Sequence, residues 1–365
     1  MRIAIAALLL LGPAAAAAET RHRPILGVGV EERFDSAAFS GGESELMSKL
    51  SAEAGYALDS EVRTLEAAYA ADLLHHLRGR NVTVDHRARL GFRDRSVERL
   101  ELWASGQLFR VEDMTSLPRF GVARVRAPAL WAWAEAGLGY RLTHTATGEI
   151  VYHGEATHLF TESYLLGTTH AAWMRLRLST TRRLELGARL RGQLFLAGSA
   201  RYADSLTPSV TARYALTRHS FVALEGGPLL YRSEAHPSTW LYRASGELGY
   251  EARGLLLGLS VGHDVMGAAG YASAVWADYI QAGATYRFTL AWSAFLGAGY
   301  YRNGRAPDRP ADADGFTGSA GVEWKLARGF AMAATYDHLE QFGALATGLG
   351  LRRDIVSLRL FYRTP

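Results

Sequence analysis

Apolar and polar residues alternate with a period of two along most of this chain of 365 residues, from about residue 25 to the end. Because successive side chains of a β-strand point to opposite sides, this pattern predicts strands with one apolar and one polar face. The clearest segment is Arg183–Leu196. Leucines and an alanine share one of its faces, and Arg189, Arg191 and Gln193 share the other. Segments of about ten such residues are what tilted strands need to cross a membrane.

A soluble β-sandwich would also alternate, but its strands usually run for only about five or six residues. The alternating segments of this chain are longer, as in Ser96–Val111. Beyond residue 18 the sequence has no stretch of about 18 uncharged apolar residues, so any membrane span has to be made of strands. We therefore predict an all-β fold, a transmembrane antiparallel up-and-down β-barrel, monomeric and with a water-filled lumen.

The number of alternating segments predicts about 18 strands, with 16 as the alternative if two weak segments are loops. The predicted strands start near residues 24, 45, 61, 81, 97, 128, 149, 168, 183, 208, 219, 239, 254, 273, 290, 315, 328 and 352. Tight turns are expected at 180–182 and 253–254, and longer loops at 35–43, 232–238 and 304–314.

The N-terminus has the pattern of a cleaved signal peptide. Arg2 precedes a short apolar run, which is followed by an alanine tract ending in Ala16-Ala17-Ala18. The run is too short for a membrane anchor, which needs about 20 apolar residues. We expect residues 1–18 to be removed before Glu19, so that residues 19–365 form the barrel of an outer-membrane protein.

The charges of the chain nearly balance, with 40 basic and 36 acidic side chains and a net charge of +4. The only lysines are Lys49 and Lys325, and no basic cluster lies on a helix face, so nucleic acid is not an expected partner. The absence of cysteine excludes disulfides and thiolate metal sites.

No motif of an enzyme stands out in the sequence. Several histidines and a serine are the candidates for catalysis, but no His-x-x-x-His, Gly-x-Ser-x-Gly or nucleotide-binding glycine motif accompanies them. The candidates are His75, His76, His144, His153, His158, His219 and Ser220. We therefore predict no catalytic activity, no cofactor and no metal.

Aromatic residues recur near the ends of the predicted strands on the apolar face, as expected where a lipid-facing belt meets the headgroups. This set predicts two girdles in contact with outer-membrane lipid. Its members are Trp240, Tyr250, Trp276, Tyr286, Trp292, Tyr300, Trp324 and Tyr336.

The polar faces predict a charged lumen wall whose arginines and carboxylates pair across neighbouring strands. Because the two signs are mixed, we expect no strong ion selectivity. The wall is predicted to include Arg99, Glu101, Glu135, Arg175, Arg177, Glu185, Arg189, Arg191, Arg243, Glu247 and Arg359.

Four tryptophans share the inward parity of these charged residues: Trp103, Trp131, Trp133 and Trp173. Aromatic planes beside charged hydrogen-bonding groups are suited to pyranose rings, so the four predict an aromatic path for sugars. The alternative is that β-bulges reverse the parity and return them to the girdles.

The chain resembles the outer-membrane β-barrel porins that are linked to bacterial exopolysaccharide export. The resemblance lies in the strand count, the arginine-rich alternation and Glu31–Ser36 at the end of the first strand. It differs at Ala37, where asparagine is usual. It also differs at the C-terminal end, because an aromatic last residue is usual, whereas Phe361-Tyr362 are followed by three more residues. The resemblance implies a polysaccharide as cargo, separate periplasmic export components as partners, and insertion by the outer-membrane insertion machinery.

Three functions follow as hypotheses. The leading one is a channel for a secreted polysaccharide, the alternative is a general diffusion porin for small solutes, and the third is an outer-membrane barrel enzyme. An inward-folded loop would favour a porin, a continuous aromatic path would favour polymer export, and convergent catalytic groups at one rim would favour an enzyme.

Overall fold

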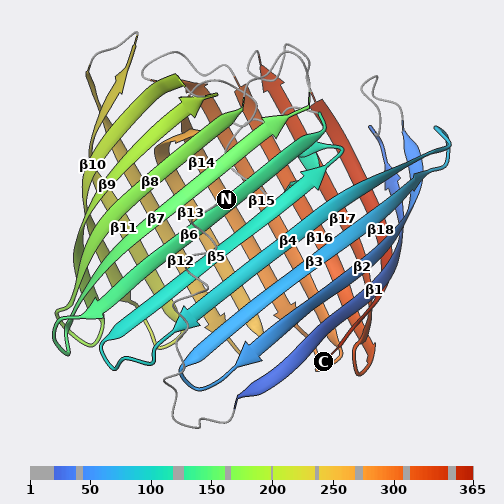
Figure 1. Cartoon of the computed structure of the whole chain (residues 1–365), viewed down its shortest axis with the longest axis horizontal. Coiled ribbons are helices and arrows are strands. Elements are labelled where there is room, and N and C mark those ends of the chain that lie inside the picture. Colours follow the sequence, from blue (N-terminus) through green and yellow to red (C-terminus); the bar gives the residue numbers. More distant parts are fainter. Residues whose placement is uncertain are drawn as a thin grey trace.

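The computed structural model is a closed barrel of 18 antiparallel strands (Figure 1). The structure describes residues 20–37, 44–117, 127–160, 166–198, 200–234, 238–267, 274–306, 313–343 and 351–364. The predicted signal peptide, residues 1–18, lies outside the described residues and stays a prediction.

Each strand pairs with its neighbours in sequence, and β1 also pairs with β18, which closes the barrel. The strands are β1 (Arg21–Asp35), β2 (Glu45–Asp59), β3 (Arg63–His76), β4 (Asn81–Asp94), β5 (Leu100–Val111), β6 (Ala129–Arg141), β7 (Ala146–Leu159), β8 (Gly167–Ser179), β9 (Leu184–Ala197), β10 (Ala200–Ala215), β11 (Ser220–Ser233), β12 (Thr239–Ala252), β13 (Leu255–Gly267), β14 (Ala274–Arg287), β15 (Trp292–Arg305), β16 (Ala313–Ala327), β17 (Phe330–Gly343) and β18 (Leu351–Arg363). A short 3₁₀ helix, η1 (Met114–Ser116), follows β5.

The connections alternate between a short end and a long end of the barrel. At the short end, where β1 begins and β18 ends, turns such as 253–254 join the strands. Arg253 and Gly254 both have positive φ (51° and 82°), as a two-residue hairpin turn requires. At the other end the connections include residues 112–128. Short periplasmic turns and long cell-surface connections are typical of outer-membrane barrels, so we call the long end the surface end.

Apolar side chains of the alternating segments face outwards and polar side chains face the lumen, as predicted. On β9, Leu186 and Leu190 are exposed on the outer side, whereas Arg189 and Arg191 face the lumen and are bonded there. The predicted girdle residues also lie at outward positions, and Trp292 stacks on Trp324 at 5.1 Å between ring centroids. The outer surface is therefore an apolar belt, and the polar groups that need water line the interior.

The strand count of 18 is confirmed, and most strands start within three residues of the predicted position. The prediction for β10 was wrong: it starts at Ala200 instead of near 208. Pro208 lies inside the strand, opposite Pro228 of β11. The ladder between β10 and β11 is interrupted at these prolines, which have no backbone N–H to donate. No helix of the described residues is long and apolar enough to cross a membrane.

Candidate functional site

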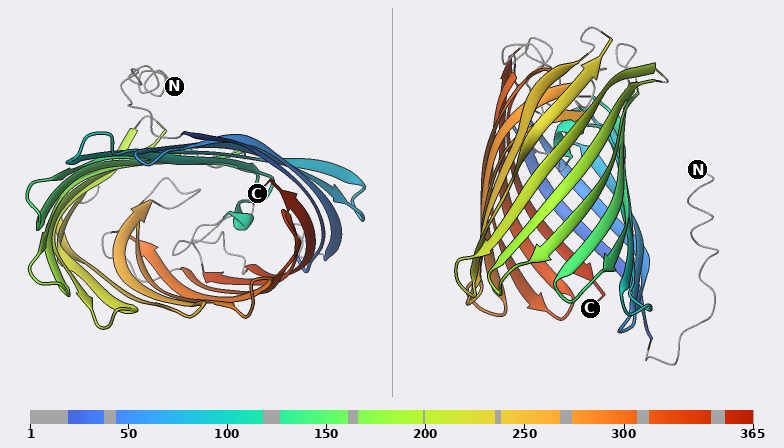
Figure 2. Two further views of the ribbon diagram at one scale, coloured as in Figure 1. Left: turned by 90° about the horizontal axis from the view of Figure 1, so that it is seen from below. Right: turned by 90° about the vertical axis from the view of Figure 1, so that its left-hand side faces the viewer.

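The lumen narrows where the chain folds inwards between β5 and β6. The segment 112–117, which contains η1, lies inside the barrel and not outside its rim (Figure 2). Met114 and Leu117 are buried, because they pack in one apolar cluster with Val111, Trp131 and others on the inner wall. The Asp113 carboxylate caps the helix by accepting from Thr115 N at 2.9 Å. We call residues 112–117 the constriction segment.

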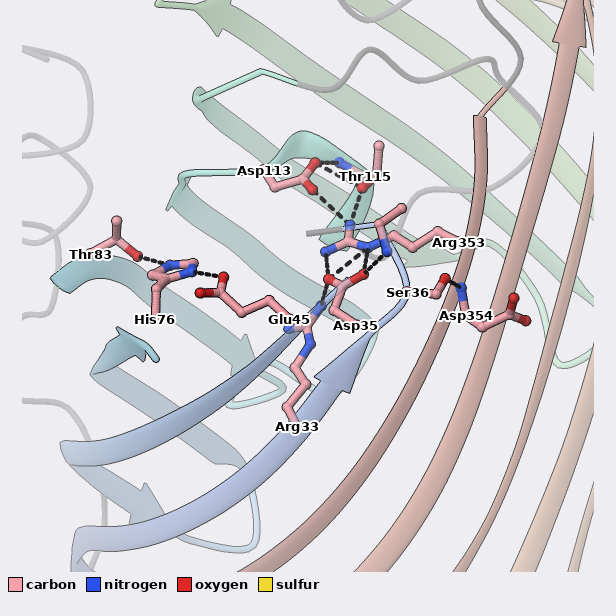
Figure 3. A network of polar contacts seen from close by, with 11 residues as sticks. Arg33, Asp35, Ser36, Glu45, His76, Thr83, Asp113, Thr115, Arg353 and Asp354 are labelled. Carbon is pink, nitrogen blue, oxygen red and sulfur yellow. Dashed lines mark hydrogen bonds and ion pairs between the residues drawn. The ribbon is translucent and has the colours of Figure 1, made fainter. Parts of the chain in front are cut away.

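Arg353 of β18 holds the constriction segment against the wall (Figure 3). Its Nε donates to both carboxylate oxygens of Asp35 on β1 at 3.0 Å, and its Nη1 donates to Asp113 Oδ2 at 2.7 Å. The same nitrogen donates to the Thr115 hydroxyl. The Arg353 side chain is only 5% exposed. A buried, fully paired arginine of this kind fixes one geometry, because losing either partner would leave a buried charge uncompensated.

A second polar contact beside this network fixes the hairpin of β3 and β4. Glu45 accepts from the backbone N–H groups of Arg78 and Gly79, at 3.0 and 3.2 Å, and lies 2.7 Å from His76 Nδ1. His76 Nε2 is 3.1 Å from the hydroxyl of Thr83 (Figure 3). Glu45 is therefore satisfied by structural contacts and is not an available acid or base.

The other half of the lumen carries a network of three arginines and two carboxylates. Arg189 and Arg243 contact Glu225, and Arg191 and Arg243 contact Asp264. The Arg191–Asp264 contact of 2.7 Å joins β9 to β13, which are four strands apart along the wall. This network therefore connects strands that are not neighbours in the wall. It carries one more positive than negative charge.

Nearer the short end, Glu149 of β7 pairs with both Arg175 and Arg177 of β8. Arg177 also reaches Glu185 of β9 at 4.0 Å. These arginines are about one-third exposed, so water screens the pairs. They keep the wall solvated and polar where it meets the lumen.

All but one of the predicted wall residues occupy lumen-facing register positions on strands. The exception is Arg99, which is exposed in the turn before β5 and does not belong to the wall. The sequence pattern does not mark this turn, because polar and apolar residues alternate through Ser96–Val111 without a break. The role of the other residues in solute passage stays a prediction.

The four tryptophans at inward positions lie in different surroundings. Trp131 is only 7% exposed beneath the constriction segment, and its Nε1 donates to Glu155 Oε1 at 2.7 Å. Trp103 lies flat on the next strand, where a Cβ on Gly137 would come within 2.2 Å of its ring. The Arg189 guanidinium lies 4.5 Å from the ring centroid of Trp173.

Trp133 lies beside His153, with 6.1 Å between ring centroids, and packs against the apolar cluster below the constriction segment. Packing within the protein thus occupies much of the surface of these tryptophans. Their part in a sugar path is an untested prediction.

The predicted wall residues did not include Arg353, Asp113, Glu225 or Asp264. A signal was present for the constriction segment, because 97 to 128 is the longest interval between predicted strand starts. Among the described residues, no group of three or more histidines and carboxylates could hold a metal ion.

Searches of solved structures find the same architecture. OccK2 (OpdF) of Pseudomonas aeruginosa, in complex with glucuronate, is 10% identical, with a TM-score of 0.50 over 94% of this chain and 98% of that chain. A second structure of OccK2 (OpdF) has 9% identity and a TM-score of 0.50, over 94% and 97% of the two chains. OpdQ of the same species has 8% identity and a TM-score of 0.48, over 96% and 100%.

At these identities the likeness shows the fold alone. A scan of protein-family models finds no match, and a search of curated proteins finds none either. None of these comparisons supports the resemblance to exopolysaccharide-export porins. The matching architecture and the apolar outer belt show that the chain is an outer-membrane β-barrel with the fold of porins.

Proposed function

We propose that this barrel is a channel for small hydrophilic solutes, which was the alternative hypothesis from the sequence. The observation that carries it is the constriction segment, which Arg353 anchors inside the lumen. An inward-folded loop narrows a porin, whereas a polymer channel needs a continuous wide path. The glucuronate in the OccK2 structure is also a small solute, which supports this size class.

The lumen chemistry supports passage and not tight binding. Arginines and carboxylates pair with each other along the wall, so their charges are largely compensated within the protein. The strands β15 and β16 present small residues to the lumen, among them Gly297, Ser319 and Gly321. Glu323 also faces inwards from β16. Small side chains on these strands leave few groups that could hold a solute, which favours weak and transient contacts.

Polysaccharide passage is the less supported function. It relied on a continuous aromatic path, but Trp131 is buried under the constriction segment and bonded to Glu155. Its periplasmic export partners stay untested predictions. A small-solute channel needs no periplasmic export partner. It needs only the insertion machinery, outer-membrane lipid around it and water in its lumen.

Liposome swelling tests the proposal. Vesicles that contain the purified barrel should swell in isotonic arabinose or glucose, and much more slowly in a maltooligosaccharide of six or more units, because the constriction limits solute size. Swelling at equal rates in both, or no swelling beyond that of protein-free vesicles, would contradict a small-solute channel. Equal rates would return the polysaccharide hypothesis to first place.

A further inference from the structure

The seam between β12 and β13 is paired over only part of its length. Register partners run from the short end up to Ala244↔His263, and none follow across this seam in the described part of the two strands. Above that point β12 still pairs with β11, and β13 still pairs with β14. Residues 239–243 and 264–266 are therefore the edges of two diverging walls at the surface end.

The surface end of β13 turns into the lumen. Figure 2, in the view from below, shows orange strand ends from this region inside the outline of the yellow strands. A Cβ on Gly267 would lie 2.2 Å from the hydroxyl of Thr169 on β8, so the tip of β13 reaches a strand that is not its neighbour in the wall. Val265 has an outward register position but is only 1% exposed, because it packs with Leu229 and Tyr231, which face inwards on β11. The outer side of one wall thus overlaps the inner side of the other.

The overlap is apolar, although the lumen below it is charged. Leu229, Tyr231 and Phe195 are at most 3% exposed, and Leu241 packs against them from the edge of β12. The Arg243–Asp264 ion pair lies at the base of the overlap, where the pairing of the seam ends. An alkyl chain is complementary to such a lining, whereas a sugar or an ion would lose its hydration there.

The lipid-facing side of the same seam is hollowed. A cavity of about 880 Å³ extends along it, and its lining includes Tyr242, Val261 and Ile280. At the edge of β12, Trp240 and Tyr242 are 68% and 61% exposed, more than any other aromatic side chain of the described residues. In this hollow Tyr242 stacks on His263, with 4.3 Å between ring centroids, and His263 Nδ1 lies 2.6 Å from Asp278 Oδ1. The lipid-facing hollow therefore carries one polar pair beside its apolar side chains.

We infer that the overlap of β13 with β11 and β12 is a lateral slot, through which a single-chain amphiphile passes between the outer leaflet and the lumen. Open sheet edges are costly in hydrocarbon, and the overlap covers them in the closed state. The apolar cluster holds the slot closed without backbone pairing, so opening needs no ladder hydrogen bond to break across this seam. This inference goes beyond the proposed function, because the ligand enters from lipid and not from water.

Cysteine labelling from the membrane tests the slot, since the chain has no cysteine of its own. The test variant is Leu229→Cys, and the control is Leu74→Cys, another buried leucine that faces the lumen. Leu74 lies on β3, which is paired at this position on both sides. Each variant is placed in vesicles containing N-dodecylmaleimide, with glutathione in all aqueous spaces to remove reagent that leaves the lipid.

We expect Leu229→Cys to react about tenfold faster than Leu74→Cys, because only the first lies behind an unpaired part of the wall. Tyr231→Cys, in the same cluster, should also react fast and serves if Leu229→Cys does not fold. Folding is checked by the faster gel mobility of the unheated barrel. Equal, slow labelling of folded test and control variants would overturn the slot.

A further arm uses water-soluble N-ethylmaleimide without glutathione. If Leu229→Cys reacts with this reagent but not with N-dodecylmaleimide, the cluster is reached through the lumen alone, and the lateral route is wrong. Salt conductance of the same samples separates the two proposals. Fast N-dodecylmaleimide labelling without conductance would remove the small-solute channel and leave the slot.

Discussion

Arg353 is a single side chain that connects β18, β1 and the constriction segment. Its contacts with Asp35 and Asp113 join positions 318 and 240 residues apart in the sequence. Period-two alternation places Arg353 on the inner face, and this much follows from the sequence. Its partners do not, because alternation fixes the side of the wall that a residue faces and says nothing about which distant residues it meets.

Replacing Arg353 with methionine tests the anchor. Asp113 would then lose its cation and Asp35 would keep only Arg33, at 3.6 Å, so we expect a loss of about 3–5 kcal/mol of unfolding free energy. The constriction segment should leave the wall, and the single-channel conductance should rise. Urea unfolding in lipid vesicles and planar-bilayer recordings measure the two effects.

The control for this substitution is Arg352→Met, which removes the neighbouring arginine on the exposed outer side. It should leave conductance unchanged, since residue 352 does not face the lumen. If the Arg353→Met variant keeps the conductance and the solute size limit of the unchanged protein, Arg353 does not determine the width of the constriction.

At the scale of the strands, the sequence predicted most of the structure. Strand number, inward and outward faces and turns such as Arg253–Gly254 all follow from local pattern, because neighbouring strands repeat the same two-residue geometry. The strand β10 begins before the predicted start near 208, and the fold tolerates Pro208 inside it beside an interrupted ladder. The turn of β13 into the lumen has no local signal, since it depends on packing against Phe195 and Leu229.

A matched pair of arginine substitutions tests the register of the strands. Leu190→Arg places a charge on the lipid side in the middle of β9 and should cost about 2–4 kcal/mol of folding free energy. Gln281→Arg places the same side chain on the water-exposed inner side in the middle of β14 and should cost far less. Folding yields into lipid vesicles over a urea series give the comparison. Equal costs would mean that the assignment of inner and outer faces is wrong.

The whole molecule combines a wall that the sequence predicts with an interior that it does not. Closure depends on the pairing of β1 with β18, which brings the two ends of the described chain together. The interior also holds two inward features, the constriction segment, which packs on β5–β7, and the tip of β13, which packs on β9–β11. A wide polymer path was expected from the lumen tryptophans, and these inward features make passage of small solutes the better supported function.

Single-channel conductance with polyethylene glycols of increasing size tests the central claim most directly, because it measures the open width of the folded barrel. The barrel should conduct KCl in discrete steps, and only the smaller glycols should enter and reduce the current. Arg353→Met should admit larger glycols than the unchanged protein, and Arg352→Met should not. Absence of conductance, or entry of large glycols into the unchanged protein, would contradict a small-solute channel narrowed by residues 112–117.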